Sequence, residues 1–115
     1  MVTMPEDQIH ELCDLTIVML HELRIRIHRV GYKQLTIAVP RFALDDTQSL
    51  TKELYPYVAA YFGYPDWRSV ERSIRFAILD AWERRDPDVW EKYFPNQKKP
   101  PSNKQFIATL AEHLR

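Results

Sequence analysis

Glycine occurs at only two positions, Gly31 and Gly63, whereas eight prolines lie mostly between segments of three- and four-residue apolar periodicity. Glycine-rich loops that cradle phosphate groups cannot be built from two isolated glycines, which excludes the nucleotide-binding enzymes that depend on such loops. Proline cannot easily continue a helix and glycine often stops one, so the positions of these residues predict helices with sharply defined ends.

The apolar periodicity predicts an all-α fold of five or six helices. The first helix begins near residue 6, and a second spans about 32–43, with Gly31 as the first helix breaker and Pro40 as an interruption. Between the two, residues 23–27 alternate apolar and basic side chains. This alternation fits either a strand-like connector or a continuation of the first helix.

The later helices are predicted from their end signals. Asp66 and Asp86 are expected to cap two of them, and Pro56 is expected to kink or restart the helix before. Ser102 and Gln105 have the spacing of a capping box, in which each side chain covers a backbone donor of the other. These signals place four helices at about 49–62, 66–85, 86–94 and 102–115.

Length and composition indicate a single domain spanning residues 1–115. The apolar fraction of 45% and the charged fraction of 28% are those of an ordinary soluble protein. The longest purely apolar run, 17–20, is far shorter than the ~18 residues of a membrane span. A single cysteine, Cys13, excludes an internal disulfide, and the acidic start of the chain is unlike a secretory signal. We therefore expect a cytoplasmic protein without membrane attachment.

Residues 55–79 have the pattern of a helix-turn-helix unit, in which a tight glycine-containing turn joins two helices. Ala59 lies four positions before the turn glycine, Gly63, and its small side chain allows the second helix to cross closely. The whole unit is predicted at 49–85, and the helix at 102–115 closes the chain. The corner residues expected to share one core are Val58, Phe62, Val70, Ile74 and Ile78.

The helix after this turn carries three arginines on its outward face. At 100° per residue, Arg68, Arg72 and Arg75 fall within about 60° of arc, opposite the apolar side, with Glu71 at the flank. Arginine can donate two hydrogen bonds to guanine in the major groove, and glutamate can accept one from cytosine. These four residues are therefore candidates for reading DNA bases. The alternative is a solvated face held by Arg–Glu pairs three and four residues apart.

Charge is distributed unevenly along the chain although the net charge is zero. Residues 1–20 form an acidic first helix with a charge of −4, whereas residues 21–44 carry a charge of +4. Such a field can orient a charged partner. The basic segment is not the recognition helix, so we expect it to hold the DNA backbone. The expected phosphate contacts are Arg24, Arg26, Arg29, Lys33 and Ser69.

No other chemistry is indicated by the sequence. Four scattered histidines and one cysteine lack the spacing of a metal site, and no Ser, His and acid can be placed as a triad. We therefore predict that the chain is not an enzyme and uses no cofactor, metal or small-molecule substrate. The spacing of five aromatic residues is more typical of core packing than of base stacking: Trp67, Trp82, Trp90, Tyr93 and Phe94.

Three sequence blocks, in order, carry a resemblance to a known family. They are residues 50–56 (LTKELYP), residues 70–78 (VERSIRFAI) with Ala81-Trp82, and residues 101–108 (PSNKQFIA) with Leu114-Arg115. From about Met19 onward, the chain resembles the C-terminal DNA-binding domain of the sporulation-initiation response regulator, stage zero sporulation protein A, of endospore-forming bacteria.

The resemblance implies a six-helix domain whose third and fourth helices form a helix-turn-helix without a wing. It also implies control of transcription with RNA polymerase through short promoter boxes, usually in tandem, on which a weak homodimer could assemble. Glu71, Arg72 and Arg75 match the family's Glu, Arg and Arg in the recognition helix. The family has Ser-Arg where this chain has Arg68-Ser69, so one reading arginine is displaced by about 100° around the helix.

The family's regulator also carries an N-terminal phosphoacceptor receiver domain, for which 115 residues leave no room. The chain is therefore expected to be either a stand-alone effector domain or a fragment, and its acidic first helix favours the former. The first function expected is sequence-specific DNA binding on the bacterial nucleoid, which the retained Glu71, Arg72 and Arg75 favour. The second is a protein-interaction module that keeps the fold and binds a homologous regulator or RNA polymerase, which the neutral charge favours.

Overall fold

The computed structural model describes the chain from residue 5 to residue 115, with side chains from residue 8 onward, and these residues form helices without any strand. This confirms the all-α prediction. The elements are α1 (Pro5–Glu22), α2 (Val30–Leu44), the π-helical turn η1 (Leu50–Leu54), α3 (Tyr55–Phe62), α4 (Trp67–Glu83), α5 (Pro87–Tyr93) and α6 (Asn103–Leu114).

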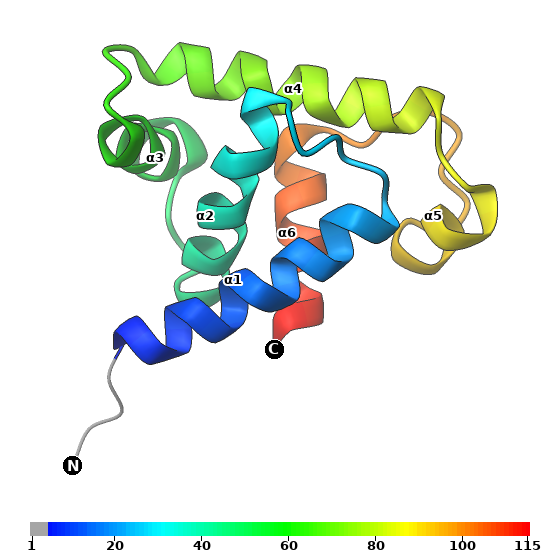
Figure 1. Cartoon of the computed structure of the whole chain (residues 1–115), viewed down its shortest axis with the longest axis horizontal. Helices are drawn as coiled ribbons and strands as arrows, with labels where there is room; N and C mark the ends of the chain where they lie inside the picture. The colour runs from blue at the N-terminus through cyan, green and yellow to red at the C-terminus, as the bar shows by residue number, and fades with distance from the viewer. Residues whose placement is uncertain (1–4) are drawn as a thin grey trace.

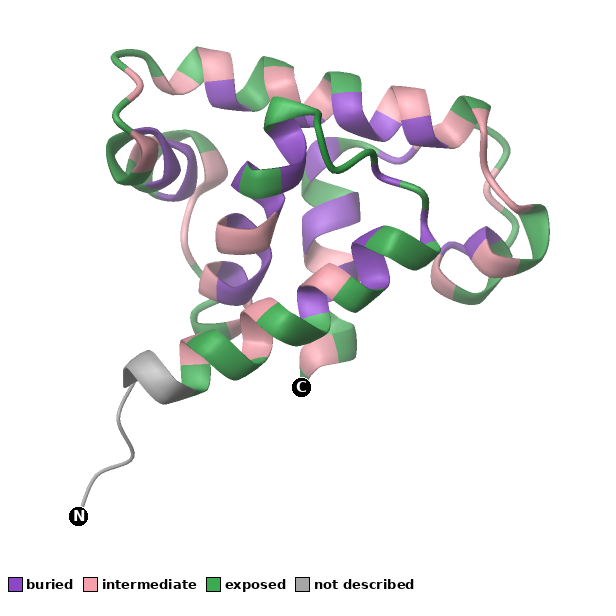
Figure 2. Ribbon diagram, in the orientation of Figure 1, coloured by how far each residue is buried: buried purple, intermediate pink, exposed green. Residues whose placement is uncertain are grey.

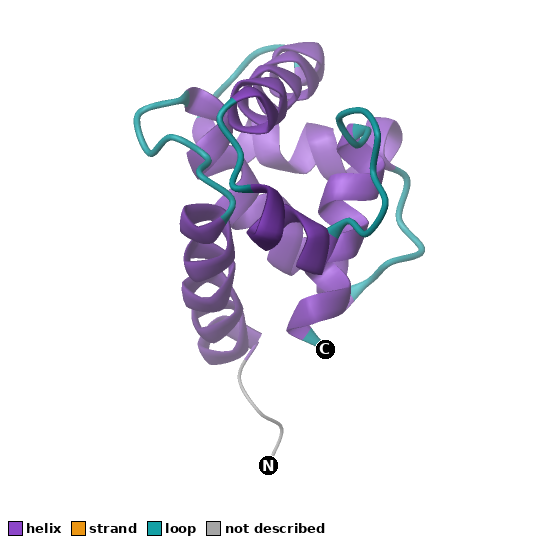
Figure 3. Ribbon diagram, turned by 90° about the vertical axis from the view of Figure 1, so that its right-hand side faces the viewer, coloured by secondary structure: helices purple, strands orange, loops and turns teal. Residues whose placement is uncertain are grey.

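The molecule is organised around α2 and α6, which pack side by side in its centre (Figure 1). α4 runs across one end of this pair and α1 crosses nearer the other end, while loops join all the helices (Figures 1 and 3). Buried residues occur along α1, α2, α3, α4 and α6 (purple in Figure 2), and Leu35, Ile74 and Leu110, from α2, α4 and α6, have no exposed surface. None of the helices in residues 5–115 is long and apolar enough to cross a membrane.

The helix-turn-helix corner is formed by α3 and α4, as predicted. Gly63 ends α3 in the left-handed conformation, with φ of 78°, and its N–H donates to the Ala60 carbonyl oxygen at 3.2 Å. Asp66 begins α4, because its carboxylate accepts from the Arg68 N–H at 2.9 Å. The predicted corner residues do share one core: Val58, Val70, Ile74 and Ile78 are fully buried, and Phe62 is half-buried against them.

Gly31 lies inside α2, so its prediction as a helix breaker is wrong. The helix begins one residue earlier, at Val30, and Gly31 is buried in its first turn. A Cβ atom at Gly31 would lie 2.5 Å from the Ser73 carbonyl oxygen and 2.8 Å from the Ala77 Cβ. The absence of a side chain therefore permits α2 and α4 to approach closely.

Pro40 also lies inside α2, and the predicted interruption is wrong, because the helix continues to Leu44. A proline has no N–H for the carbonyl four residues earlier, which here belongs to Thr36. That carbonyl oxygen instead accepts from the Cys13 Sγ at 3.2 Å. Burial raises the pKa of the Cys13 thiol, which keeps it protonated as a donor. A side chain of α1 thus satisfies the carbonyl that Pro40 leaves free.

Of the two alternatives for residues 23–27, the structure has the connector, although as a turn and not a strand. α1 ends at Glu22, and Arg24 then adopts a left-handed backbone conformation with φ of 64°. Leu23 and Ile25 are buried on either side of it. The Leu23 carbonyl oxygen accepts from the Trp90 Nε1 at 3.2 Å, which holds the connector against α5.

The ends of the third and last helices differ in detail from the predictions. Of the two alternatives at Pro56, a kink or a restart, the structure has the restart. The residues before it form the π-helical turn η1, and α3 begins at Tyr55. Ser102 caps α6 by accepting from the Gln105 N–H at 3.1 Å. The reciprocal half of the capping box is absent among the described contacts, since the Gln105 amide exchanges hydrogen bonds with Gln97.

Candidate nucleic-acid interface

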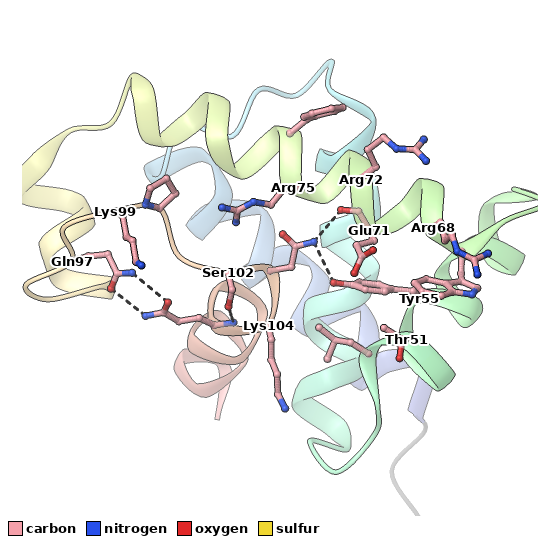
Figure 4. Close-up of a pocket in the computed structure, with 16 residues that line it drawn as sticks. Thr51, Tyr55, Arg68, Glu71, Arg72, Arg75, Gln97, Lys99, Ser102 and Lys104 are labelled. Atoms are coloured by element: carbon pink, nitrogen blue, oxygen red, sulfur yellow. Dashed lines mark hydrogen bonds between the residues drawn. The ribbon is translucent and has the colours of Figure 1, made fainter.

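An open groove of about 970 Å³ runs along the outward face of α4 (Figure 4). One wall is α4 itself, and the other is the segment 97–105, which contains part of the connection between α5 and α6 and the first turn of α6. Tyr55 lies between the two walls. The four predicted base-reading residues, Arg68, Glu71, Arg72 and Arg75, all line this groove.

Two of the three arginines project from α4 away from α6, with different surroundings (Figure 4). Arg72 is exposed, and no hydrogen bond within the described part of the chain holds its guanidinium. Arg68 is also exposed, but it pairs with Asp66 at 3.5 Å and lies over the Trp67 ring at 5.0 Å. The displaced arginine is therefore folded back toward the helix-turn-helix corner.

Glu71 and Arg75 lean toward the start of α6 and connect the two walls (Figure 4). Arg75 is half-buried, and its Nη1 donates to the Pro101 carbonyl oxygen at 2.6 Å. The Asn103 Nδ2 donates to the Glu71 carbonyl oxygen at 3.0 Å and to the Tyr55 hydroxyl at 3.2 Å. Burial raises the pKa of Tyr55, so its hydroxyl stays neutral and accepts this bond. These contacts fix the orientation of α4 relative to α6.

The wall formed by α6 carries residues that the sequence interpretation missed. Lys99 and Lys104 line the groove on either side of Ser102, the N-cap of α6. Their ammonium groups add to the partial positive charge at a helix N-terminus, so this wall attracts anions. The lysines near Pro100-Pro101 were the available signal, but only the folded chain brings them opposite the arginines of α4.

Three of the predicted phosphate-binding residues gather elsewhere, around Asp80 in the second half of α4. The Asp80 carboxylate lies 3.2 Å from the Arg26 Nε, 3.4 Å from the Arg29 Nη2 and 2.8 Å from the Arg84 Nη2. Arg24 joins this cluster by donating from Nη1 to the Arg84 carbonyl oxygen at 2.7 Å. The hydrogen bond from Arg84, together with the charges of Arg84, Arg26 and Arg29, lowers the pKa of Asp80 against the opposing effect of burial.

The remaining two predicted phosphate contacts lie near the helix-turn-helix corner. The Lys33 ammonium lies 5.1 Å from the centre of the Phe62 ring and 5.8 Å from that of Tyr64. The Ser69 hydroxyl donates to the Asp66 carbonyl oxygen at 2.7 Å, within the first turn of α4. The five predicted phosphate contacts thus fall into two groups, one around Asp80 and one at the helix-turn-helix corner.

A family model described as the C-terminal part of the sporulation initiation factor Spo0A matches residues 16–114. The chain belongs to this family. This match confirms the resemblance inferred from the three sequence blocks. The family consists of DNA-binding effector domains of a transcription regulator and is not an enzyme family. The match to the Spo0A C-terminal domain begins within α1 and extends through α6.

In this Spo0A-type domain, α3 and α4 are the helix-turn-helix, and the groove lies on the exposed side of α4. Among the side chains of residues 8–115, no group of three or more His, Cys, Asp or Glu gathers in a way that could hold a metal ion. The polar chemistry of the groove comes instead from guanidinium, ammonium, carboxylate and amide groups.

The Asp80 cluster makes stability depend on pH. Asp80→Asn removes the charge that three arginines share, and we expect a loss of about 1–2 kcal/mol in the free energy of unfolding near neutral pH. Because folding lowers the Asp80 pKa, the carboxylate stabilises the protein above its usual pKa of about 3.9, and this contribution is lost as the pH falls further. Urea unfolding of both proteins at neutral and acidic pH measures the difference.

The difference between wild type and Asp80→Asn should therefore shrink in acid. Asp14→Asn, which removes an exposed carboxylate from α1, is the matched control and should change stability little at any pH. A difference for Asp80→Asn that is the same at neutral and acidic pH would contradict the assigned role of the carboxylate.

Proposed function

We propose that the chain is a sequence-specific regulator of transcription that inserts α4 into the major groove of double-stranded promoter DNA. The observation that carries this proposal is the exposed Arg72 beside Glu71 and Arg75, on a groove wall directly after the helix-turn-helix corner. Residues near the N-terminus of such a helix are those that reach base edges. Arginine reads guanine by two hydrogen bonds, and glutamate accepts from the cytosine amino group.

The backbone of the bound DNA would be held by the basic residues around α4. Lys99 and Lys104 lie across the groove from the arginines, where a phosphate could approach the N-terminus of α6. The residues around Asp80 provide a second set of cations near the other half of α4. On this model the protein acts on the bacterial nucleoid, at tandem boxes occupied by weakly associated copies, and regulates RNA polymerase there.

A protein-interaction module is the second candidate, and two contacts favour it. Arg68 is paired with Asp66, and one guanidinium nitrogen of Arg75 is occupied by the Pro101 carbonyl oxygen. Both arginines would have fewer free donors for bases than an unrestrained side chain. In this case the same fold would bind a homologous regulator or RNA polymerase without reading DNA.

Binding to selected DNA distinguishes the two candidates. The protein is first used to select duplexes from a randomised pool, and fluorescence anisotropy then compares the selected duplex with a scrambled one at two salt concentrations. Sequence-specific proteins bind their sites at least about a thousandfold more tightly than random DNA. Failure to select any sequence, with equal affinity for both duplexes, would leave the interaction module as the better description.

The predicted phosphate contacts have a distinct signature in the salt dependence. Arg26→Ala should lower the slope of log affinity against log salt by about 0.9 and weaken binding to the selected and scrambled duplexes alike. Arg115→Ala is the control, because Arg115 pairs with Asp46 and Glu112 at the far end of α6. A changed base preference with an unchanged slope would show that Arg26 has another role.

A further inference from the structure

Phe76 is a large apolar side chain that α4 leaves in solvent. The residue is 54% exposed, whereas the other large apolar residues of α4 are buried or half-buried. Other aromatic rings of this helix have partners, since Trp67 stacks on Tyr55 and Trp82 contacts Trp90. No ring or cation within the described residues stacks on Phe76. Neither packing in the core nor stacking on another described side chain therefore accounts for the position of this ring.

The position of Phe76 places it with the candidate reading residues. It follows Arg75 directly, lies one helical turn after the exposed Arg72, and lines the same groove. Four residues advance a helix by about 6 Å, which corresponds to about two base-pair steps of DNA. An α4 helix in the major groove that brings Arg72 to a base would therefore bring Phe76 to a base close by.

The major groove offers one apolar group at its base edges, the C5 methyl group of thymine. We propose that Phe76 packs against such a methyl group and thereby selects thymine within about two base pairs of the guanine read by Arg72. This inference rests on the proposed DNA-binding function and adds a specificity determinant to it. The three arginines and Glu71 recognise hydrogen-bonding groups, whereas Phe76 recognises a hydrocarbon group that cytosine lacks at the same position.

Replacing thymine by deoxyuridine tests the contact at a single methyl group. In the duplex selected by the wild-type protein, each thymine is changed in turn to deoxyuridine, which keeps the base pair and removes only the methyl. Wild type should lose about threefold to fivefold in affinity at one thymine near the guanine, the value of one buried methyl group. Phe76→Ala should show no loss at that thymine, while its responses at the other thymines stay as in wild type.

Two further variants sharpen the comparison. Phe76→Leu keeps an apolar side chain and should retain most of the response to the methyl group. Tyr61→Ala removes another exposed aromatic ring, from α3 and outside the groove, and should leave every deoxyuridine response unchanged. Because Phe76 and Tyr61 are both mostly in solvent, neither replacement should disturb folding, which thermal unfolding checks.

The outcomes separate this inference from the proposed function. If the selected duplex is preferred but wild type and Phe76→Ala respond identically to deoxyuridine at all positions, DNA reading stands and the role of Phe76 is overturned. The ring would then serve contact with a protein. If no duplex is preferred over a scrambled one, the proposed function and this inference both fall.

Discussion

Arg72→Ala should weaken binding to the selected duplex about tenfold to a hundredfold, with a much smaller effect on a scrambled duplex. The reason is that a side chain that donates two hydrogen bonds to guanine contributes about 1–3 kcal/mol of discrimination against other bases. Arg75→Ala should cause a loss of similar size, although it also removes the bond to the Pro101 carbonyl oxygen. Anisotropy titrations on both duplexes at fixed salt measure these ratios.

The matched control for these variants is Arg85→Ala. The Arg85 guanidinium lies over the Trp82 ring at 3.6 Å, beyond the end of α4, so its removal should not change base preference. If Arg72→Ala and Arg75→Ala lose the same factor on both duplexes, they contact only the backbone. If neither loses affinity, the interaction module becomes the better function.

Gly31→Val should destabilise the protein by about 3 kcal/mol, because the new side chain overpacks a tight helix crossing. The Cβ would lie 2.5 Å from the Ser73 carbonyl oxygen and 2.8 Å from the Ala77 Cβ, and neither atom belongs to a flexible side chain. α2 and α4 would have to separate, which opens the core between them. Urea unfolding measures the loss of free energy.

Gly63 provides the comparison for this prediction. A Cβ at Gly63 has no atom within 4 Å, so Gly63→Ala is penalised only by the positive φ, at about 1–2 kcal/mol. Asn tolerates this conformation better, so Gly63→Asn should be milder. A small effect of Gly31→Val, equal to that of Gly63→Ala, would contradict the tight crossing.

Features that depend on residues close together in the sequence could be predicted. The apolar stripe of α4, with Val70, Ile74 and Ile78, follows from helical periodicity, and the caps Asp66 and Asp86 follow from local hydrogen-bonding chemistry. The outward placement of Arg68 and Arg72 follows from the same periodicity, because an amphipathic helix has only one face to bury, whereas the half-buried position of Arg75 depends on Pro101.

Features that depend on distant residues could not be predicted. The sequence predicts a helix breaker at Gly31, because the close approach of Ser73 becomes apparent only in the folded chain. The sequence likewise predicts an interruption at Pro40, because nothing in α2 indicates that Cys13 will satisfy the free carbonyl oxygen of Thr36. The gathering of Arg26 and Arg29 at Asp80 likewise requires the connector to fold onto α4 across more than fifty positions of sequence.

The bond between Arg75 and the Pro101 carbonyl oxygen has a consequence for the thermodynamics of recognition. Immobilising a long side chain on binding costs about 0.5–1.5 kcal/mol of rotamer entropy, and Arg75 bears part of this cost before DNA arrives. Arg72 must lose its rotamer freedom during association. In the proposed complex, Arg75 would act as a preorganised side chain and Arg72 as an adaptable one, so removing Arg72 should relieve a larger unfavourable entropy of binding than removing Arg75. A ligand that displaced α6, and with it the Pro101 carbonyl oxygen, would release Arg75 and make it as adaptable as Arg72.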